Sequence, residues 1–141
     1  METLFSISNL LTMPFWLLMI LLPHWSWSKR IIGSVWIVAP AALLYAILIV
    51  PQMGGVLGDL MNPSLGAVQT LLGSAEGATV GWVHFLAFDL FVGRWAYLDA
   101  RKIGLTAWIS SPILFLVLML GPLGFVLHLL ARSVKTRSLA S

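Results

Sequence analysis

The stretch GWVHFLAFDLFVGRWAYLDARK, residues 81–102, decides how the rest of the chain is interpreted. It has the length and apolar content of a membrane-spanning helix, yet it carries His84, Asp89 and Arg94 at steps of five residues. An ionised Asp or Arg near the centre of a span costs about 2.5–3.5 kcal/mol. Ionisable residues inside a span indicate a functional site, and we expect that site on this helix.

The composition places the chain among membrane proteins. Of its 141 residues, 60% are hydrophobic and only 9% are charged, and the mean hydropathy is +0.98. A soluble domain carries roughly 25% charged residues. The net charge of +3 indicates no nucleic-acid partner, because seven of the eight basic residues fall near expected span ends or in the tail, where lipid headgroups attract them. The chain has no cysteine, which excludes disulfides, thiolate metal sites and covalent haem.

We therefore expect an all-α integral membrane protein with one domain and four transmembrane helices. A hydrocarbon core requires roughly 20 apolar residues per helix. The four candidate spans lie at about residues 4–22, 31–50, 77–98 and 109–131. In the long second connection, the Asn62-Pro63 start signal and the Gly73 stop signal predict a short amphipathic helix over about residues 63–72, either at the membrane surface or as a re-entrant segment. Residues 132–141 form a basic tail.

An even number of spans puts both termini on one side of the membrane. The basic residues then divide four to three between the two sides, so their distribution assigns no orientation. Pro14, Pro40 and Pro122 fall within expected spans, where each removes a backbone hydrogen bond and favours a kink. Such prolines are either ordinary for membrane helices or open a cavity around the third span, which has none.

The third span is expected at the centre of the bundle. A step of five residues turns a helix by about 140°, so its three polar residues point to three different sides. A helix with a costly group on each side is best surrounded by the other spans. Gly73, Gly77 and Gly81 form a series of small residues that favours the close approach of another helix.

Asp89 is the strongest candidate for a functional residue, because a buried carboxyl group must pair, accept hydrogen bonds or stay protonated. His84 and Arg94 share its helix. With four spans, His128 and Asn9 fall in the same half of the membrane as His84. They are second-tier candidates, together with Asp99.

Each of these residues also has a structural interpretation. A lone intramembrane histidine is usually a hydrogen-bonded structural group, and Arg94 with Asp99 can form an interfacial ion pair that fixes the helix register. Two histidines at one depth could ligate haem or a metal ion, but no further ligands converge on them. We therefore expect no cofactor and no metal.

Three stretches carry a resemblance to a known family. They are GWVHFLAFDLFVGRWAYLDARKIG from residue 81, NLLTMPFWLLMILLP at 9–23 and GPLGFVLHLL at 121–130. Together they resemble the small membrane-protein family of the plant abscisic-acid-deficient-four protein, the neoxanthin synthase family of plastids and photosynthetic bacteria. The resemblance implies a carotenoid-related role, in plants the isomerisation of violaxanthin to the allenic neoxanthin. The missing transit peptide indicates either a bacterial member, in a plasma or thylakoid membrane, or a trimmed product, whereas the plant relatives lie in plastid membranes.

The implied reaction suits these residue types. Turning a 5,6-epoxide into an allenic alcohol is redox-neutral, and it needs one proton delivered to the epoxide oxygen and one removed from the neighbouring polyene carbon. A carboxyl group in a low dielectric is a natural acid, and a neutral imidazole is a natural base. The resemblance leads to a cofactor-independent isomerase in which Asp89 protonates the epoxide and Arg94 or His84 stabilises the charge. His84 or His128 then takes the carbon-bound proton, and the roles of Asp89 and His84 are interchangeable.

Two other classes of function stay open. In the first, the protein is not catalytic but binds a xanthophyll or forms a scaffold for another membrane protein of a pigment complex, and the polar residues of the third span fix the helix arrangement. The second is a dimeric transporter of small cations, which is disfavoured because the charges face all round one helix. The expected partners are therefore a carotenoid and the lipid membrane, with a partner membrane protein or a homo-oligomer as further options.

Overall fold

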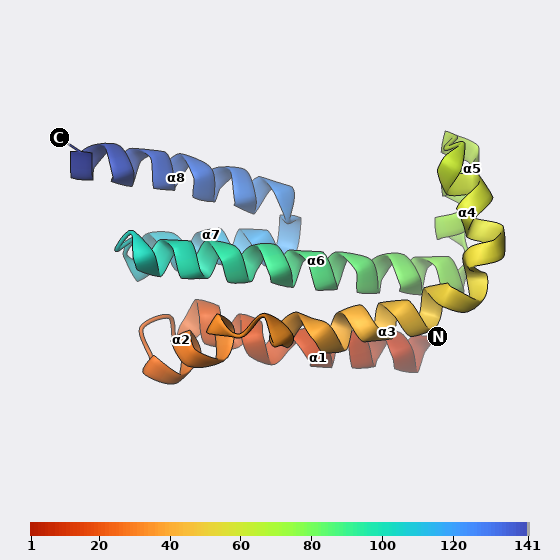
Figure 1. Cartoon of the computed structure of the whole chain (residues 1–141), viewed down its shortest axis with the longest axis horizontal. Coiled ribbons are helices and arrows are strands. Elements are labelled where there is room, and N and C mark those ends of the chain that lie inside the picture. Colours follow the sequence, from red (N-terminus) through yellow and green to blue (C-terminus); the bar gives the residue numbers. More distant parts are fainter. Residues whose placement is uncertain (141) are drawn as a thin grey trace.

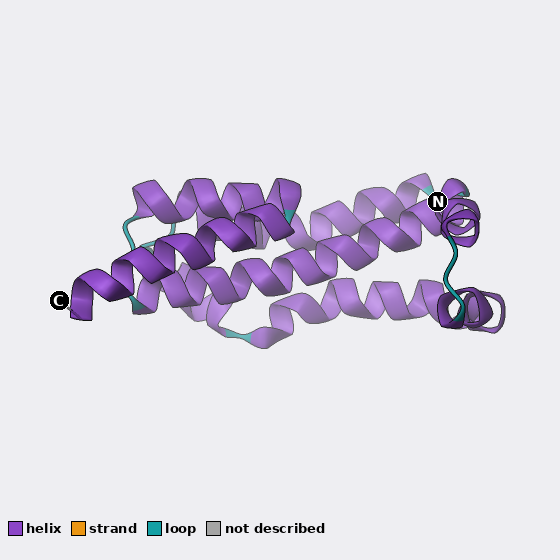
Figure 2. Ribbon diagram, turned by 90° about the horizontal axis from the view of Figure 1, so that it is seen from above, coloured by secondary structure: helices purple, strands orange, loops and turns teal. Residues whose placement is uncertain are grey.

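The computed structural model describes residues 1–140, with side chains through residue 138, and this range is helical with short connections and no strand (Figure 1, Figure 2). The α-helices are α1 (Glu2–Leu21), α2 (Ser26–Gly33), α3 (Ala39–Ile49), α4 (Met53–Met61), α5 (Leu65–Gly73), α6 (Ala75–Lys102), α7 (Ala107–Leu120) and α8 (Pro122–Ala140). The short 3-10 helices η1 (Val35–Val38) and η2 (Val50–Gln52) flank α3. The expected all-α fold class is confirmed.

Helix α6 is the axis of the molecule. It has 28 residues, which corresponds to about 42 Å at 1.5 Å per residue. The Ser74 side chain caps its start by accepting a hydrogen bond from the Gly77 N–H, and the chain turns away at Gly104, whose φ is 68°. Helices α1, α2, α3, α5, α7 and α8 all contact α6, which confirms the expectation that this helix lies at the centre (Figure 1).

The fourth expected span, residues 109–131, is two helices rather than one. Helix α7 ends at Leu120, and α8 begins at Pro122 and runs back along α7 (Figure 1). A proline suits the first turn of a helix, because its missing N–H has no partner there in any case. Gly124 permits the close return, since a Cβ at this position would overlap the backbone of α7 at Leu116 and Val117. Pro122 therefore marks a reversal of the chain, and the kink expected there is wrong.

Two helical segments are long and apolar enough to cross a membrane. They are Glu2–Leu21 and the run Val35–Met61, which passes through η1, α3, η2 and α4. Helix α7 is a shorter apolar helix of 14 residues, and the α7–α8 hairpin lies along only part of α6 (Figure 1). The structure thus supports two candidate spans and does not establish four.

The second connection contains more helix than expected. Helix α5 agrees with the predicted amphipathic helix, but the glycine-rich segment before it also forms a helix, α4. Both lie across one end of the molecule (Figure 1). The small-residue series on α6 serves this packing, because a Cβ at Gly77 would overlap the Leu71 carbonyl of α5 and one at Gly81 would lie 3.1 Å from the Leu72 side chain.

The other prolines act differently from one another. Pro14 lies inside α1 and Pro112 inside α7, whereas Pro40 sits in the first turn of α3. The prediction of a proline within the first span is confirmed. The prediction for Pro40 is confirmed only in part, because Pro40 lies within the candidate span Val35–Met61 but in the first turn of α3, where its missing N–H costs no hydrogen bond within that helix.

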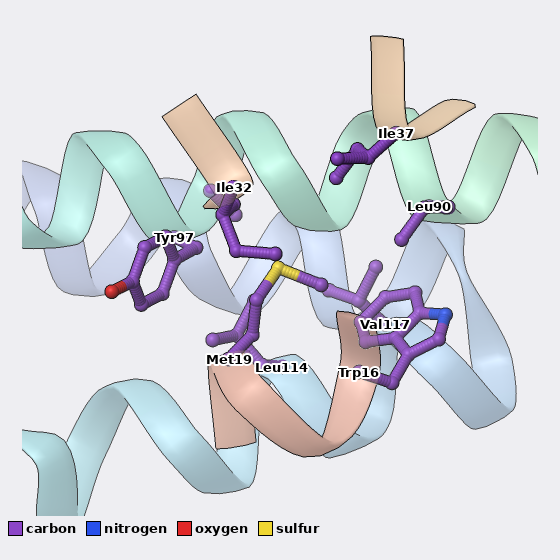
Figure 3. Close-up of a cluster of buried hydrophobic side chains, with 9 residues drawn as sticks. Trp16, Met19, Ile32, Ile37, Leu90, Tyr97, Leu114 and Val117 are labelled. Carbon is purple, nitrogen blue, oxygen red and sulfur yellow. The ribbon is translucent and has the colours of Figure 1, made fainter. Parts of the chain in front are cut away.

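The core lies where α1, α2, α6 and α7 meet. Figure 3 shows its side chains pointing toward one another from these helices. The largest of them, Trp16 and Tyr97, are fully buried. Gly93 makes room for Trp16, since a Cβ there would overlap the indole ring. The Tyr97 hydroxyl donates a 2.7 Å hydrogen bond to the Pro23 carbonyl and so holds the α1–α2 connection against α6.

Charged residues separate along the long axis of the molecule. Every Lys and Arg lies on α2, on the second half of α6 or on α8: Lys29, Arg30, Arg94, Arg101, Lys102, Arg132, Lys135 and Arg137. Glu2, Asp59 and Glu76 lie at the opposite end, near the N-terminus and the α4–α5 pair (Figure 1). We call these the basic end and the acidic end. Helix α8 ends at the basic end, opposite the start of α1, because the chain reverses at Pro122 (Figure 1). The expectation that both termini share one side of the membrane depends on four spans and stays a prediction.

Candidate functional site

Asp89 lies midway along α6 and faces the turn between α7 and α8. A Cβ added at Gly121 would lie 2.5 Å from Asp89 Oδ1, so the glycine lets the turn approach the carboxyl group. The half-buried side chain lines a cavity of about 730 Å³ between α1, α6 and this turn. Asp89 is the one titratable residue among the residues described as lining that cavity: Asn9, Met13, Trp82, Phe85, Leu86, Asp89, Leu118, Met119, Leu120, Gly121, Pro122 and Leu123.

The enclosure of Asp89 differs from the expected one. We anticipated shielding by the other three spans, whereas α1 and the α7–α8 turn supply the other walls and α3 lies elsewhere around α6. Among the residues that the structure describes, no hydrogen-bond donor or cation contacts the Asp89 carboxyl group. The Asp89 carboxyl group therefore faces the open volume of the cavity and is not paired with a described residue.

Asn9, which was predicted in the same half of the membrane as His84, shares the Asp89 cavity. Its Oδ1 accepts a 3.1 Å hydrogen bond from Trp82 Nε1, and its Nδ2 donates a 2.9 Å bond to the Phe5 carbonyl. The Phe5 and Trp82 rings lie 5.3 Å apart. Asn9 therefore orients an aromatic wall of the cavity.

His84 lies on another side of α6 and lines a different cavity. Its ring lies 5.3 Å from the Tyr45 ring and 4.9 Å from the Phe88 ring. With Gln52 and Tyr45, it borders a space of about 240 Å³ between α3, α4, α5 and α6. None of the residues that line this space also lines the Asp89 cavity. The prediction that the polar residues point to different sides is confirmed, and the structure does not bring His84 and Asp89 together.

Arg94 is engaged by the backbone of α2. Its Nε donates a 2.8 Å hydrogen bond to the Ile32 carbonyl and its Nη2 a 2.6 Å bond to the Gly33 carbonyl. The last carbonyl groups of a helix have no partner within the helix, so the guanidinium satisfies two of them at the end of α2. The ion pair anticipated between Arg94 and Asp99 is wrong, because each residue has other partners.

Asp99 instead joins α6 to α8. His128 Nε2 lies 2.9 Å from Asp99 Oδ2, and Arg132 Nε donates to both carboxylate oxygens at 2.9 and 3.1 Å. The His128 side chain is only 1% exposed, and its ring meets the Trp95 ring edge-on at 5.4 Å. The prediction that His128 shares the half of the molecule that holds His84 is wrong, because the reversal carries His128 to the basic end.

The sequence also left several of these residues unassigned. Gly121, Tyr45 and Gln52 border the two cavities, and Arg132 completes the cluster around Asp99. The spacing of His128 and Arg132, four residues apart, places them on one face of a helix and was an available signal. Among the described residues, no three His, Asp or Glu side chains gather as ligands for a metal ion. The catalytic roles given to His84, Asp89, Arg94, His128, Asn9 and Asp99 stay predictions.

All of the site residues described above except Arg132 lie within a match to a known family. Residues 3–128 match the family described as ABA DEFICIENT 4-like. The chain belongs to the ABA DEFICIENT 4-like family. This membership confirms the resemblance found in the sequence and points to a carotenoid-related role for the chain. No curated protein and no solved structure matches this ABA DEFICIENT 4-like protein.

Proposed function

We propose that this ABA DEFICIENT 4-like protein is a multi-pass integral membrane protein that isomerises an epoxide-bearing end group of a carotenoid, with Asp89 as the catalytic residue. Family membership supports a carotenoid-related role. The observation that carries the catalytic assignment is the cavity at Asp89, where one carboxyl group without a partner lies in largely apolar surroundings.

The outer surface supports residence in a membrane. Leu10 is 71% exposed, Leu43 63% and Phe88 59%, and these side chains lie on three different helices. A soluble monomer rarely exposes large contiguous apolar areas. Helix α1, with 20 residues, is about 30 Å long and so equals the thickness of a hydrocarbon core.

The Asp89 cavity suits an apolar ring with one polar oxygen. Its volume of about 730 Å³ lies in the range of small-molecule sites, and such sites combine apolar walls with a few polar groups that fix orientation. Trp82 and Phe85 provide flat apolar surface for the conjugated chain that follows the ring. Asn9 adds the other polar side chain of the wall.

One carboxyl group can perform both proton transfers of the reaction. The protonated oxygen of Asp89 donates its proton to the epoxide oxygen as the bond from that oxygen to the ring carbon beside the polyene breaks. The second carboxyl oxygen removes the proton from the adjacent polyene carbon, and the electrons of that C–H bond form the new double bond of the allene. Asp89 ends protonated as it began, and substrate and product have the same atoms.

This scheme replaces the one inferred from the sequence, in which His84 or His128 is the base. His84 borders a separate cavity, and His128 is buried against Asp99 at the basic end. A base on either residue would require the substrate to reach a second site. The single-carboxyl scheme needs only the cavity in which Asp89 already lies.

The test is expression of the full chain in a host that accumulates violaxanthin, followed by pigment analysis. We expect a new allenic isomer, and we expect Asp89→Asn to lower its formation by at least about 100-fold, the usual contribution of general acid–base catalysis. Asp59→Asn is the matched control, because it makes the same change on exposed helix α4 and should leave the isomer unchanged.

Two results would redirect the proposal. Product formation that survives Asp89→Asn would remove the carboxyl group from the reaction. Unchanged pigments, with carotenoid that co-purifies with the protein, would favour the non-catalytic binding function instead.

A further inference from the structure

A cavity at the basic end lies outside the site described above. It occupies about 560 Å³ between the α1–α2 connection and the α6–α7 connection. Its polar lining includes His24, Ser26, Lys29, Arg101 and Thr106. No Asp or Glu is among its lining residues, and Asp99, the acidic residue nearest in sequence to Arg101, is already engaged by His128 and Arg132. The cavity therefore gathers positive charge without a matching negative charge.

Arg101 is held in this cavity by partners that carry no negative charge. Its Nη1 lies 3.0 Å from His24 Nδ1, and its Nη2 donates to the Leu105 carbonyl at 2.8 Å and to Ser110 Oγ at 2.7 Å. Its Nε is buried without a hydrogen-bond partner among the described residues. Burial lowers the pKa of Arg101 from its ordinary value, yet a guanidinium stays charged in proteins. Arg101 is thus a half-buried cation whose charge none of the described residues neutralises.

The start of α7 adds to the positive character of this cavity. Thr106, Ala107 and Trp108 all line it, and Thr106, the N-cap residue, makes no hydrogen bond that caps the helix. The first N–H groups of a helix and the positive end of its dipole favour an anion at this place. The helix start reinforces the field of Lys29 and Arg101.

An apolar groove continues directly from this cavity. It encloses about 820 Å³ between α1 and α7, and Ile20, Leu21, Phe115 and Leu116 are among its walls. Pro23, Ala107 and Trp108 line both spaces, so the groove adjoins the cavity. Trp108 stands at the junction with 91% of its surface exposed. Tryptophan favours the boundary between lipid headgroups and acyl chains, so the junction marks the depth of that boundary.

We propose that this joined site binds one phospholipid with an anionic headgroup. The phosphate group contacts Lys29 and Arg101 in the cavity, and one acyl chain lies in the groove between α1 and α7. A free anion would leave the groove uncovered, and a choline headgroup would bring its own cation against Lys29 and Arg101. The combination of uncompensated positive charge and adjoining apolar groove therefore fits a lipid with net negative charge. This inference is independent of the isomerase activity.

The test measures lipid binding to the purified full chain in a neutral detergent by native mass spectrometry. The probes are phosphatidylglycerol, phosphatidylcholine with the same acyl chains, glycerol 1-phosphate and inorganic phosphate. We expect phosphatidylglycerol to bind most tightly. Lys29→Gln should weaken it about fivefold, which corresponds to about 1 kcal/mol for one basic group near a lipid phosphate.

Arg30→Gln is the matched control. Arg30 is the next residue on α2 and carries the same charge, but it lies over the Trp27 ring at 5.3 Å and does not line the cavity. We expect the affinity of the Arg30→Gln variant for phosphatidylglycerol to differ less than twofold from that of the parent protein. Lys29 and Arg30 are both exposed, so both variants should fold, and circular dichroism checks this.

Three outcomes would overturn the proposal. Equal binding of phosphatidylcholine would show that the headgroup charge is not recognised. Equal binding of glycerol 1-phosphate or inorganic phosphate would assign the cavity to a free phosphate compound. Equal losses in Lys29→Gln and Arg30→Gln would show a diffuse surface attraction in place of a site.

Discussion

Two carboxyl groups ten residues apart on α6, Asp89 and Asp99, have opposite surroundings. Asp99 is contacted by His128 and Arg132 from α8, and its charge is matched within the protein. Asp89 has no such partner among the described residues and faces a cavity that the Gly121 turn keeps open. Both arrangements depend on the same hairpin, since α8 supplies the partners of one carboxyl group and the turn before it lies against the other. The difference separates a carboxyl group that holds helices together from one that is available to a ligand.

The largest expected effect comes from closing the space beside Asp89. In Gly121→Ala, the added methyl group would lie 2.5 Å from Asp89 Oδ1, so the carboxyl group must move. A displaced catalytic group loses about 100-fold in rate. We expect isomer formation in the violaxanthin-producing host to fall by that factor.

Gly66→Ala is the control for this effect, because a Cβ at that position on α5 meets no atom within 4 Å. It should leave isomer formation unchanged. Full activity in Gly121→Ala, with the protein folded, would break the link between the turn and Asp89.

Removal of the charge on Asp99 should affect stability rather than chemistry. Asp99→Asn loses the charge-assisted hydrogen bonds to Arg132 and His128, and such bonds contribute about 2 kcal/mol. We expect the free energy of unfolding, measured by denaturant titration in detergent, to fall by about this amount. The remaining folded protein should form the isomer at an unchanged rate. A loss of rate as large as that of Asp89→Asn would erase the distinction between the two carboxyl groups.

Arg94 lies on α6 between Asp89 and Asp99, so its substitution tests whether it takes part in the reaction or only holds helices together. Arg94→Gln removes the charged donors to the last carbonyl groups of α2, and we expect a loss of about 1 kcal/mol in the free energy of unfolding. Arg94→Lys keeps the charge without the planar fork and should recover only part of it. Isomer formation per folded molecule should stay the same in both variants. A selective loss of product would assign Arg94 to the reaction.

The smallest expected effect belongs to His84. His84→Gln changes a cavity that shares no residue with the Asp89 cavity, so product formation should stay within about twofold of the parent. The measurement is the same pigment analysis, with protein quantity held equal. A loss comparable to that of Asp89→Asn would revive the two-residue scheme, in which His84 serves as the base.

The sequence correctly predicted those features that depend on the geometry of a single helix. The polar third span predicted both the central place of α6 and the separation of its three ionisable residues, because these follow from helical geometry alone. The start and stop signals around residues 63–72 predicted α5 for the same reason.

The fold of the segment 109–131 could not be predicted from the geometry of a single helix. It is apolar throughout, and membrane helices tolerate proline, so its pattern suits a kinked span as well as a hairpin. The hairpin depends on contacts between distant residues, such as Asp99 with Arg132 and Gly121 with Asp89. The misplacement of His128 and the mistaken partner of Arg94 follow from this absence of tertiary information.

The reversal at Gly121 also bears on how the chain is made. With α8 folded back, the three basic residues that follow Val126, Arg132, Lys135 and Arg137, lie at the same end of the molecule as those of α2 and the end of α6. The acidic end carries only three charged side chains, so in a bilayer it is the end with fewer charges to strip of water. Insertion that keeps the basic end on the ribosome's side of a bilayer would therefore keep α8 on that side as well.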